Sequence, residues 1–128
     1  MIRALVVEDD QIVIEVICEV LQMGNIDVIG RGNNGKEAVE LFCKLKPDVV
    51  LLDVMMPRYD GFYALQKIRQ YNPLAKVIMV TADLTDETEK KLKELKASAI
   101  AYKPYDVDVL IETIQQVNQG EQTCSANS

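Results

Sequence analysis

Histidine is absent from this chain of 128 residues. Without it, the chain alone cannot form a Ser-His or Cys-His catalytic centre, a histidine-ligated metal site or a phosphohistidine. Any histidine chemistry must therefore come from a partner. Cysteine is scarce too, because Cys18, Cys43 and Cys124 form no Cys-x-x-Cys pair, and the first two lie inside apolar helical patterns. This usage predicts buried thiols in a reducing compartment and disfavours a disulfide framework or a zinc site.

Positive charge is also in short supply, with 14 Lys and Arg against 20 Asp and Glu and a net charge of −6. This balance disfavours direct binding of nucleic acid. No apolar run approaches the roughly 18 residues of a membrane span. The acidic stretch Glu8-Asp9-Asp10 comes too early for a secretory signal. We therefore expect a cytoplasmic protein without a membrane segment. Its 48% apolar content is enough for the core of one domain.

Short apolar runs alternate with helical patterns along the chain. The runs predict strands over residues 4–7, 27–30, 49–52, 77–80 and 99–102. The helical patterns predict helices over 10–23, from Gly35 towards Pro47, from Asp60 towards Asn72, and over 85–96 and 106–118. Parallel strands need helical crossovers, so the alternation predicts an α/β fold with a five-stranded parallel sheet. Residues 2–118 would form this domain, and 119–128 a flexible polar tail.

Apolar spacing also predicts which helix faces are buried. The positions expected inside are Ile12, Val13, Val16, Ile17, Val20 and Leu21 in the first helix, and Ala38, Val39, Leu41, Phe42 and Leu45 in the second. In the last two helices they are Leu84, Leu92 and Leu95, then Val107, Leu110, Ile114 and Val117. The stripe of the fourth helix is thin, which predicts light packing on the sheet.

Polar side chains stand where the apolar strands end. They are Glu8, Asp9, Asp53, Thr81 and Lys103. The carboxyl ends of parallel strands meet at one edge, where such sheets bind ligands. Two carboxylates about 4 Å apart repel by about 4 kcal/mol at an effective dielectric constant of 20. Either one carboxyl pKa is raised or a hard divalent cation is bound. Mg²⁺ fits best, and beside a lysine it would suit phosphoryl transfer with Asp53 as nucleophile.

In order and spacing, several short segments match a known family. They are Leu5-Val6-Val7-Glu8-Asp9-Asp10, Pro47 to Pro57 with Asp60-Gly61, Val80-Thr81-Ala82, and Lys103-Pro104-Tyr105. Over about residues 2–118 the chain resembles a response-regulator receiver domain, the phosphoacceptor module of two-component signalling. This resemblance implies a doubly wound, flavodoxin-like (CheY-like) sheet in the order 2-1-3-4-5.

The resemblance also implies a role for each site residue. Asp53 would accept a phosphoryl group from the phosphohistidine of a sensor histidine kinase or phosphotransfer protein. The Mg²⁺ ligands would be Asp53, Asp9, the Met55 carbonyl and, through water, Glu8. Lys103 would neutralise the phosphoryl oxygens, the Ala82 amide would contact them, and the Thr81 hydroxyl would move towards them as the switch. The domain would catalyse its own phosphotransfer and dephosphorylation and no other reaction.

The chain also departs from the family pattern. Ile100 stands where many receivers carry an aromatic residue, which disfavours an aromatic rotamer switch. Tyr102 should lie on the opposite face from Lys103 and contribute to partner binding. Met55 cannot hydrogen-bond an attacking water, although Asp83 could approach it. We therefore expect slow to moderate self-dephosphorylation.

Three other interpretations remain. The Gly30 to Gly35 segment matches G-x-G-x-x-G, as in an NAD-binding half-domain, although a tight turn also explains it. A phosphatase with an Asp nucleophile would need a second acid where Met55 stands. A receiver that binds partners without phosphorylation is disfavoured by the complete acid, hydroxyl and lysine set. We expect partner contact on the face made by the fourth helix, fifth strand and fifth helix. The receiver would be stand-alone or a fragment of a longer regulator.

Overall fold

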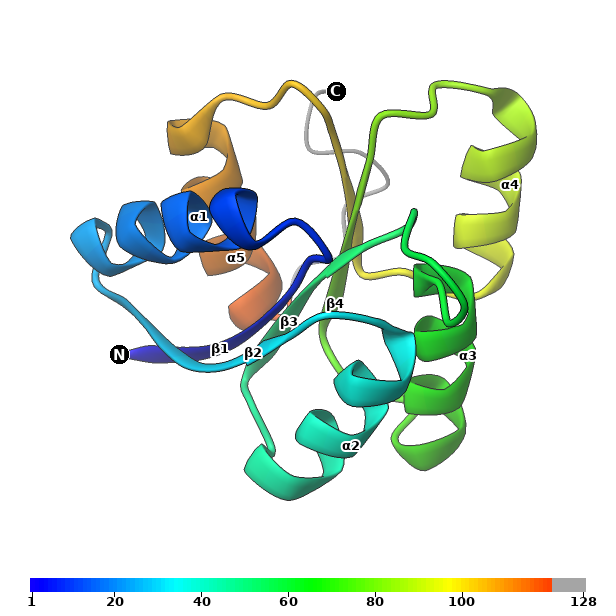
Figure 1. Ribbon diagram of the computed structural model, residues 1–128, viewed down its shortest axis with the longest axis horizontal. Coiled ribbons are helices and arrows are strands. Elements are labelled where there is room, and N and C mark those ends of the chain that lie inside the picture. Colours follow the sequence, from blue (N-terminus) through cyan, green and yellow to red (C-terminus); the bar gives the residue numbers. More distant parts are fainter. Residues whose placement is uncertain (121–128) are drawn as a thin grey trace.

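Five parallel strands form one sheet in the order β2-β1-β3-β4-β5, as Figure 1 shows for the computed structural model, which describes residues 1–120. The strands are β1 (Ile2–Val7), β2 (Ile26–Gly32), β3 (Val49–Asp53), β4 (Val77–Thr81) and β5 (Ala99–Tyr102). The helices are α1 (Gln11–Met23), α2 (Gly35–Leu45), α3 (Gly61–Tyr71), α4 (Asp86–Glu94) and α5 (Val107–Asn118). The predicted alternation and the implied strand order are both confirmed.

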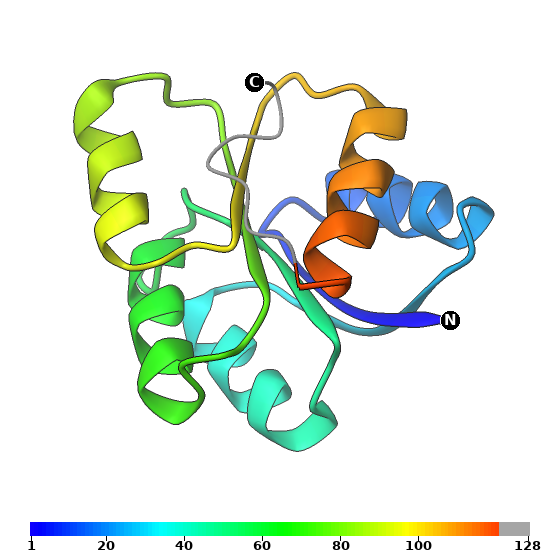
Figure 2. The same cartoon turned by 180° about the vertical axis from the view of Figure 1, so that it is seen from behind.

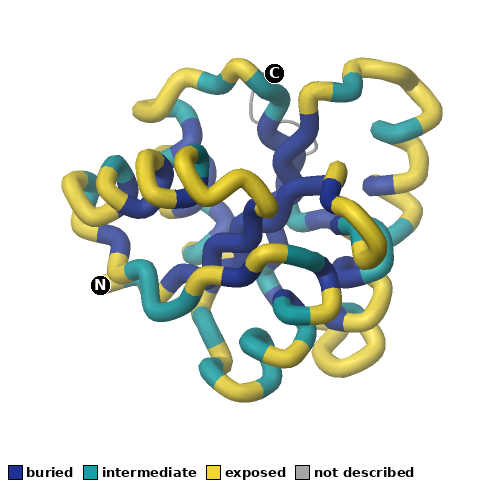
Figure 3. The backbone as a smooth tube through the Cα atoms, in the orientation of Figure 1, coloured by how far each residue is buried: buried dark blue, intermediate teal, exposed yellow. Residues whose placement is uncertain are grey.

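Helices cover both faces of the sheet. Figures 1 and 2 show α1 and α5 on one face and α2, α3 and α4 on the other. The strands are therefore apolar on both sides, and every residue of β3 and β4 is buried (Figure 3). Within β1, Ala4 and Val6 pack towards α1 and α5, while Leu5 and Val7 pack towards the other layer. This alternation explains why the strands read as continuous apolar runs.

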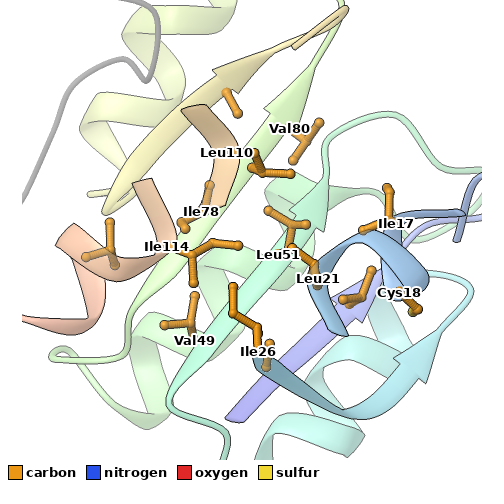
Figure 4. Packing of buried hydrophobic residues seen from close by; sticks show 14 of the residues in the cluster. Ile17, Cys18, Leu21, Ile26, Val49, Leu51, Ile78, Val80, Leu110 and Ile114 are labelled. Carbon is orange, nitrogen blue, oxygen red and sulfur yellow. The ribbon is translucent and has the colours of Figure 1, made fainter. Parts of the chain in front are cut away.

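The core between the sheet and the α1–α5 layer shows how the helices are held. In Figure 4, Leu21 of α1 and Ile114 of α5 lie against Leu51 of β3. All three side chains are buried. Full burial of one such side chain contributes roughly 1.5–3 kcal/mol. This packing holds the crossovers that bring the strand ends together.

Each helix begins at a residue whose side chain accepts a backbone hydrogen bond from the first turn. These N-cap residues are Asp10, Asn34, Asp60, Thr85 and Asp106. Such caps satisfy amide groups that have no partner within the helix and typically stabilise by about 1 kcal/mol. The Asp60 cap was predicted, and it starts α3 a short loop after Asp53.

The buried face of α1 agrees only in part with the prediction. Ile17, Cys18 and Leu21 are buried as predicted, but Ile12 and Val16 are 75% and 55% exposed, and Ile14 is buried in their place. The helix carries apolar residues on both sides, and the buried positions lie roughly opposite Ile12 at about 100° per residue. Spacing alone could not choose between the two faces.

Other predicted core positions are also exposed. Leu84 is 71% exposed because it precedes the Thr85 cap and lies outside α4. Val107, in the first turn of α5, is exposed as well. On α2 the predicted core residues are half-buried, apart from Ala38, which is buried. Cys43, also on α2, is half-buried too, so the prediction that it is buried was wrong.

Two remaining predictions concern α4 and the end of the chain. Leu92 is the one buried residue within α4, which confirms its thin apolar stripe. Gln119 caps the end of α5. The rest of the predicted tail, residues 121–128 with Cys124, lies outside the described residues. Within residues 1–120, none of the helices has both the length and the apolar composition to cross a membrane.

Candidate functional site

Three charged side chains meet at the carboxyl ends of the strands. Glu8 follows β1, Asp53 ends β3, and Lys103 follows β5. The Lys103 Nζ lies 3.0 Å from Asp53 Oδ2 and 3.3 Å from Glu8 Oε1. Both carboxylates are buried, at 4% exposure for Glu8 and 7% for Asp53. A single ammonium group is thus shared by two acids that lie far apart in the sequence.

Asp9 adds a third carboxylate at the rim of this site. Glu8, Asp9 and Asp53 each offer an oxygen atom, and these three atoms all lie within 4.8 Å of one another. Asp9 is exposed, and its backbone N–H donates to Glu8 Oε2 at 3.0 Å. A cluster of carboxylate oxygens is the ligand type that hard divalent cations prefer.

The crowding of acids changes their protonation. Burial, together with a hydrogen bond to Asp53 and the Asp53 charge, raises the pKa of Glu8 from 4.5 to about 8 against the opposing effect of Lys103. For Lys103, burial lowers the pKa, but the hydrogen bond and charge of Asp53, with those of Glu8, outweigh it and raise the pKa overall. Near neutral pH the metal-free site therefore favours a protonated Glu8 and a charged Lys103.

The second oxygen of Asp53 faces the loop that follows β3. The Met55 N–H donates to Asp53 Oδ1 at 3.3 Å, and the Met55 side chain is exposed. Both Asp53 oxygens therefore have a hydrogen-bond donor, one from Lys103 and one from Met55.

Thr81 and Ala82 lie at the end of β4. Thr81 is buried, its carbonyl accepts from the Lys103 N–H at 2.8 Å, and its Oγ1 accepts from the Asp83 N–H at 3.0 Å. Ala82 is exposed. Among residues 1–120, no hydrogen bond joins either residue to the three acids. The hydrogen of the Thr81 hydroxyl is left to donate to a further acceptor.

The Asp83 side chain binds the start of α4 through both of its oxygens. Its Oδ1 accepts from the Thr85 N–H at 2.9 Å and its Oδ2 from the Thr88 hydroxyl at 2.7 Å. These hydrogen bonds lower the pKa of Asp83, with the Thr88 bond as the largest cause. Both oxygens thus bind the start of α4, and the approach of Asp83 to an attacking water stays a prediction.

Two residues of the matching segments, Gly61 and Tyr105, were given no role from the sequence and lie near the site. A Cβ added at Gly61 would lie 2.4 Å from the Asp53 carbonyl oxygen and 2.7 Å from the Val54 Cα, so only glycine lets α3 start this close. The signal was present as the Asp-Gly pair that opens the helix. Tyr105 is half-buried, and burial raises its pKa although the Lys103 charge opposes this. The sequence signal for Tyr105 was its position directly after Lys103-Pro104.

The glycines of the Gly30 to Gly35 segment serve packing. The Gly35 N–H donates to the Tyr59 carbonyl at 2.6 Å, and an added Cβ would lie 2.4 Å from the Asp60 carbonyl oxygen. Asn34 Oδ1 accepts from the Glu37 N–H at 2.9 Å at the start of α2. Gly30 and Gly32 lie in β2, Gly35 starts α2, and none of the three has a positive φ, so the expected tight turn at these glycines was wrong. The missing Cβ of Gly35 instead lets α2 start against the backbone of Tyr59 and Asp60.

Ile100 and Tyr102 both pack towards the α2, α3 and α4 layer. Ile100 is buried and Tyr102 half-buried in that core. Tyr102 therefore lies apart from the Lys103 ammonium, as alternation predicts. The burial of Ile100 leaves no exposed side chain at the position where many receivers carry an aromatic residue.

Comparisons with known proteins agree with the fold. The family described as "Response regulator receiver domain" matches residues 4–115. "Protein CcdB" of Bacillus subtilis is 35% identical over 117 residues, which cover 91% of this chain and 98% of that protein. A protein-glutamate methylesterase/protein-glutamine glutaminase of Archaeoglobus fulgidus is 37% identical over 100 residues, but the match spans 28% of the enzyme and 78% of this chain.

Solved structures show the same architecture. The response regulator domain of Thermotoga maritima CheB is 29% identical, with a TM-score of 0.85 over 93% of this chain and 97% of that one. A LuxR-family DNA-binding response regulator from Staphylococcus aureus is 27% identical, with a TM-score of 0.87 over 92% of this chain and 99% of that one.

Proposed function

The chain belongs to the response regulator receiver domain family and is a phosphoacceptor domain, and from this premise we propose that Asp53 is the residue that accepts the phosphoryl group. The observation that carries the proposal is the pairing of buried Asp53 with Lys103, 3.0 Å away, inside a cluster of acids. Of the two acids that contact Lys103, Asp53 lies at the shorter distance.

The proposed transfer forms one bond and breaks one. An Asp53 carboxylate oxygen attacks phosphorus, and the P–N bond to the partner's phosphohistidine breaks. The electron pair of that bond returns to the imidazole nitrogen. This chain contains no histidine, so the donor imidazole belongs to a sensor histidine kinase or a phosphotransfer protein.

The residues around Asp53 would stabilise the negative charge of the incoming phosphoryl group. Lys103 would place its ammonium against the phosphoryl oxygens, since it already contacts Asp53. The Thr81 oxygen accepts from the Asp83 N–H, and the hydrogen of the Thr81 hydroxyl would donate to a phosphoryl oxygen. The Ala82 amide would be a further donor. Donors aimed at developing charge are the main source of catalysis in phosphoryl transfer.

We further propose Mg²⁺ as the cofactor. Asp9 and Asp53 would bind it directly, Glu8 through water, and Met55 through its carbonyl. The fit rests on three carboxylate oxygens that lie within 4.8 Å of one another, which is the ligand type that Mg²⁺ prefers. When bound, Mg²⁺ supplies positive charge that offsets the carboxylates and the phosphoryl oxygens.

Phosphorylation would change affinity for a downstream protein through the α4-β5-α5 face. The support is the shallow anchoring of α4, where Leu92 is the single buried residue. A helix with few buried contacts is the kind of element that a local charge change can shift. The free thiols Cys18 and Cys43 fit a reducing compartment such as the cytoplasm.

The test is phosphorylation by acetyl phosphate, with and without Mg²⁺, read by intact mass. The expected result is a Mg²⁺-dependent gain of one phosphoryl group that Asp53→Asn abolishes. Asp86→Asn, at an exposed position on α4, is the matched control and should still gain the group. If neither acetyl phosphate nor a phosphorylated histidine kinase modifies the protein, the phosphorylation-independent interpretation replaces this one.

A further inference from the structure

Two tyrosine rings lie together where α2 meets the start of α3. The ring centroids of Tyr59 and Tyr63 are 5.1 Å apart, with the planes tilted by 53°. The Lys36 Nζ lies over the Tyr59 ring and the Lys67 Nζ over the Tyr63 ring, each 6.0 Å from the centroid. We call these four residues the tyrosine–lysine cluster.

The backbone around this cluster is tied to both helices. The Gly35 N–H, at the start of α2, donates to the Tyr59 carbonyl at 2.6 Å. The Tyr63 N–H donates to the Asp60 side chain at 2.9 Å. Figures 1 and 2 both show α2 and α3 side by side. The rings are therefore presented by a fixed backbone, which reduces the entropy lost when a partner binds.

The cluster is cationic on a protein that is acidic overall. Lys36, Lys67 and the neighbouring Arg58 are exposed, while the net charge of the chain is −6. The ion pairs found in residues 1–120 join other cations, namely Lys93 with Glu89 and Lys103 with the two buried acids. Within that part of the chain, no ion pair includes Lys36, Lys67 or Arg58.

We propose that the tyrosine–lysine cluster binds an acidic segment of a partner protein. Ammonium, guanidinium and phenol groups are donors, and the carboxylates of Asp and Glu are the matching acceptors. Nucleic acid is a poorer match, because each ring contacts the other ring and has a lysine over it, which leaves little ring face for a base to stack on. The acidic surface elsewhere would also repel a phosphate backbone. The proposal does not depend on phosphorylation of Asp53.

The probe is a peptide of about ten residues that alternates Glu and Ser, titrated into the ¹⁵N-labelled full chain at low salt. Amide chemical shift changes should concentrate at Lys36, Tyr59, Tyr63 and Lys67 and should fade at high salt. Lys36→Gln with Lys67→Gln should weaken binding about tenfold, because two exposed ion pairs with the peptide are lost. Both lysines are exposed, so the substitutions should not disturb the fold. An amide spectrum of the variant that matches the wild type away from the substituted positions verifies this.

The matched control is Lys90→Gln with Lys96→Gln, which removes the same charge from exposed positions at α4 and just after it. Equal weakening by both pairs of substitutions would overturn the proposal, because net charge alone would then explain binding. Shift changes centred on other residues would overturn it too. So would tighter binding of an oligouridine of similar length at the cluster, or self-association in sedimentation that Lys36→Gln with Lys67→Gln abolishes.

Discussion

Replacing Glu8 with Gln should stabilise the metal-free protein, although it removes a partner of Lys103. Glu8 is 4% exposed and its pKa is raised from 4.5 to about 8, mainly by burial. At about pH 7 the unfolded chain carries an ionised Glu8 and the folded protein a protonated one, so folding takes up a proton. Between pH 4.5 and about 7, each pH unit lowers the free energy of unfolding by about 1.4 kcal/mol, so the proton uptake lowers the stability by about 3 kcal/mol. A glutamine side chain resembles the protonated acid and avoids that cost.

The sign of the pH dependence follows from the same linkage. Below pH 4.5 both states of the wild type hold the proton, so the two proteins should be equally stable. As the pH rises towards 8, the unfolded state holds fewer protons than the folded state, and the stability of the wild type falls relative to Glu8→Gln. Above about pH 8 the difference should become constant.

Thermal unfolding in EDTA, followed by circular dichroism at about pH 4.5 and about pH 7, measures this difference. About 3 kcal/mol corresponds to a gain in Tm of roughly 10 °C for a chain of this size. Glu19→Gln, at an exposed position on α1, is the control and should change Tm little. Equal Tm values for Glu8→Gln and the wild type at neutral pH would refute the reasoning, because Glu8 would then be ionised in the folded site.

Three further predictions concern the same end of the sheet. Mg²⁺ should raise the Tm of the wild type more at about pH 8.5 than at about pH 5.5, because Glu8 loses its proton more readily at high pH. In a thermal shift assay, a gain in Tm that does not depend on pH would contradict this. Gly61→Ala should lower the free energy of unfolding in urea by roughly 1–3 kcal/mol, because the added Cβ meets backbone atoms. Gly24→Ala should lower it less, because its Cβ meets the Ile111 side chain, and equal losses would contradict this reasoning. Met55→Asn should speed hydrolysis of the phosphorylated protein several-fold, because the Asn side chain can bind the attacking water. An unchanged rate of phosphate release would contradict the idea that Met55 makes hydrolysis slow.

The sequence was enough to predict the alternation of strands and helices and the meeting of Glu8, Asp53 and Lys103 at one end of the sheet. Buried parallel strands read as apolar runs, and the point where each run stops marks Glu8, Asp53 and Lys103. The meeting of these side chains follows once the strands are parallel, because their carboxyl ends share one edge. The strand order came from the family resemblance, since periodicity carries no information about which strands are neighbours.

What could not be predicted depends on contacts between elements. The α1 helix has apolar residues on both sides, so the buried face was decided by the sheet beneath it, and Ile12 and Val16 were left outside. The commitment of Asp83 to Thr85 and Thr88 depends on where α4 starts. Neither fact can be read from local composition.

The hydroxyl of Thr81 also acts as an anchor for the next helix. It accepts from the Asp83 amide, and Asp83 in turn holds Thr85 and Thr88 at the start of α4. A turn of this hydroxyl towards a phosphoryl group on Asp53 would leave the Asp83 amide without its acceptor. The loop before α4 would then lose one of its attachments to β4. A phosphoryl group on Asp53 would thus act on the start of α4 through the hydrogen bond between Thr81 and Asp83.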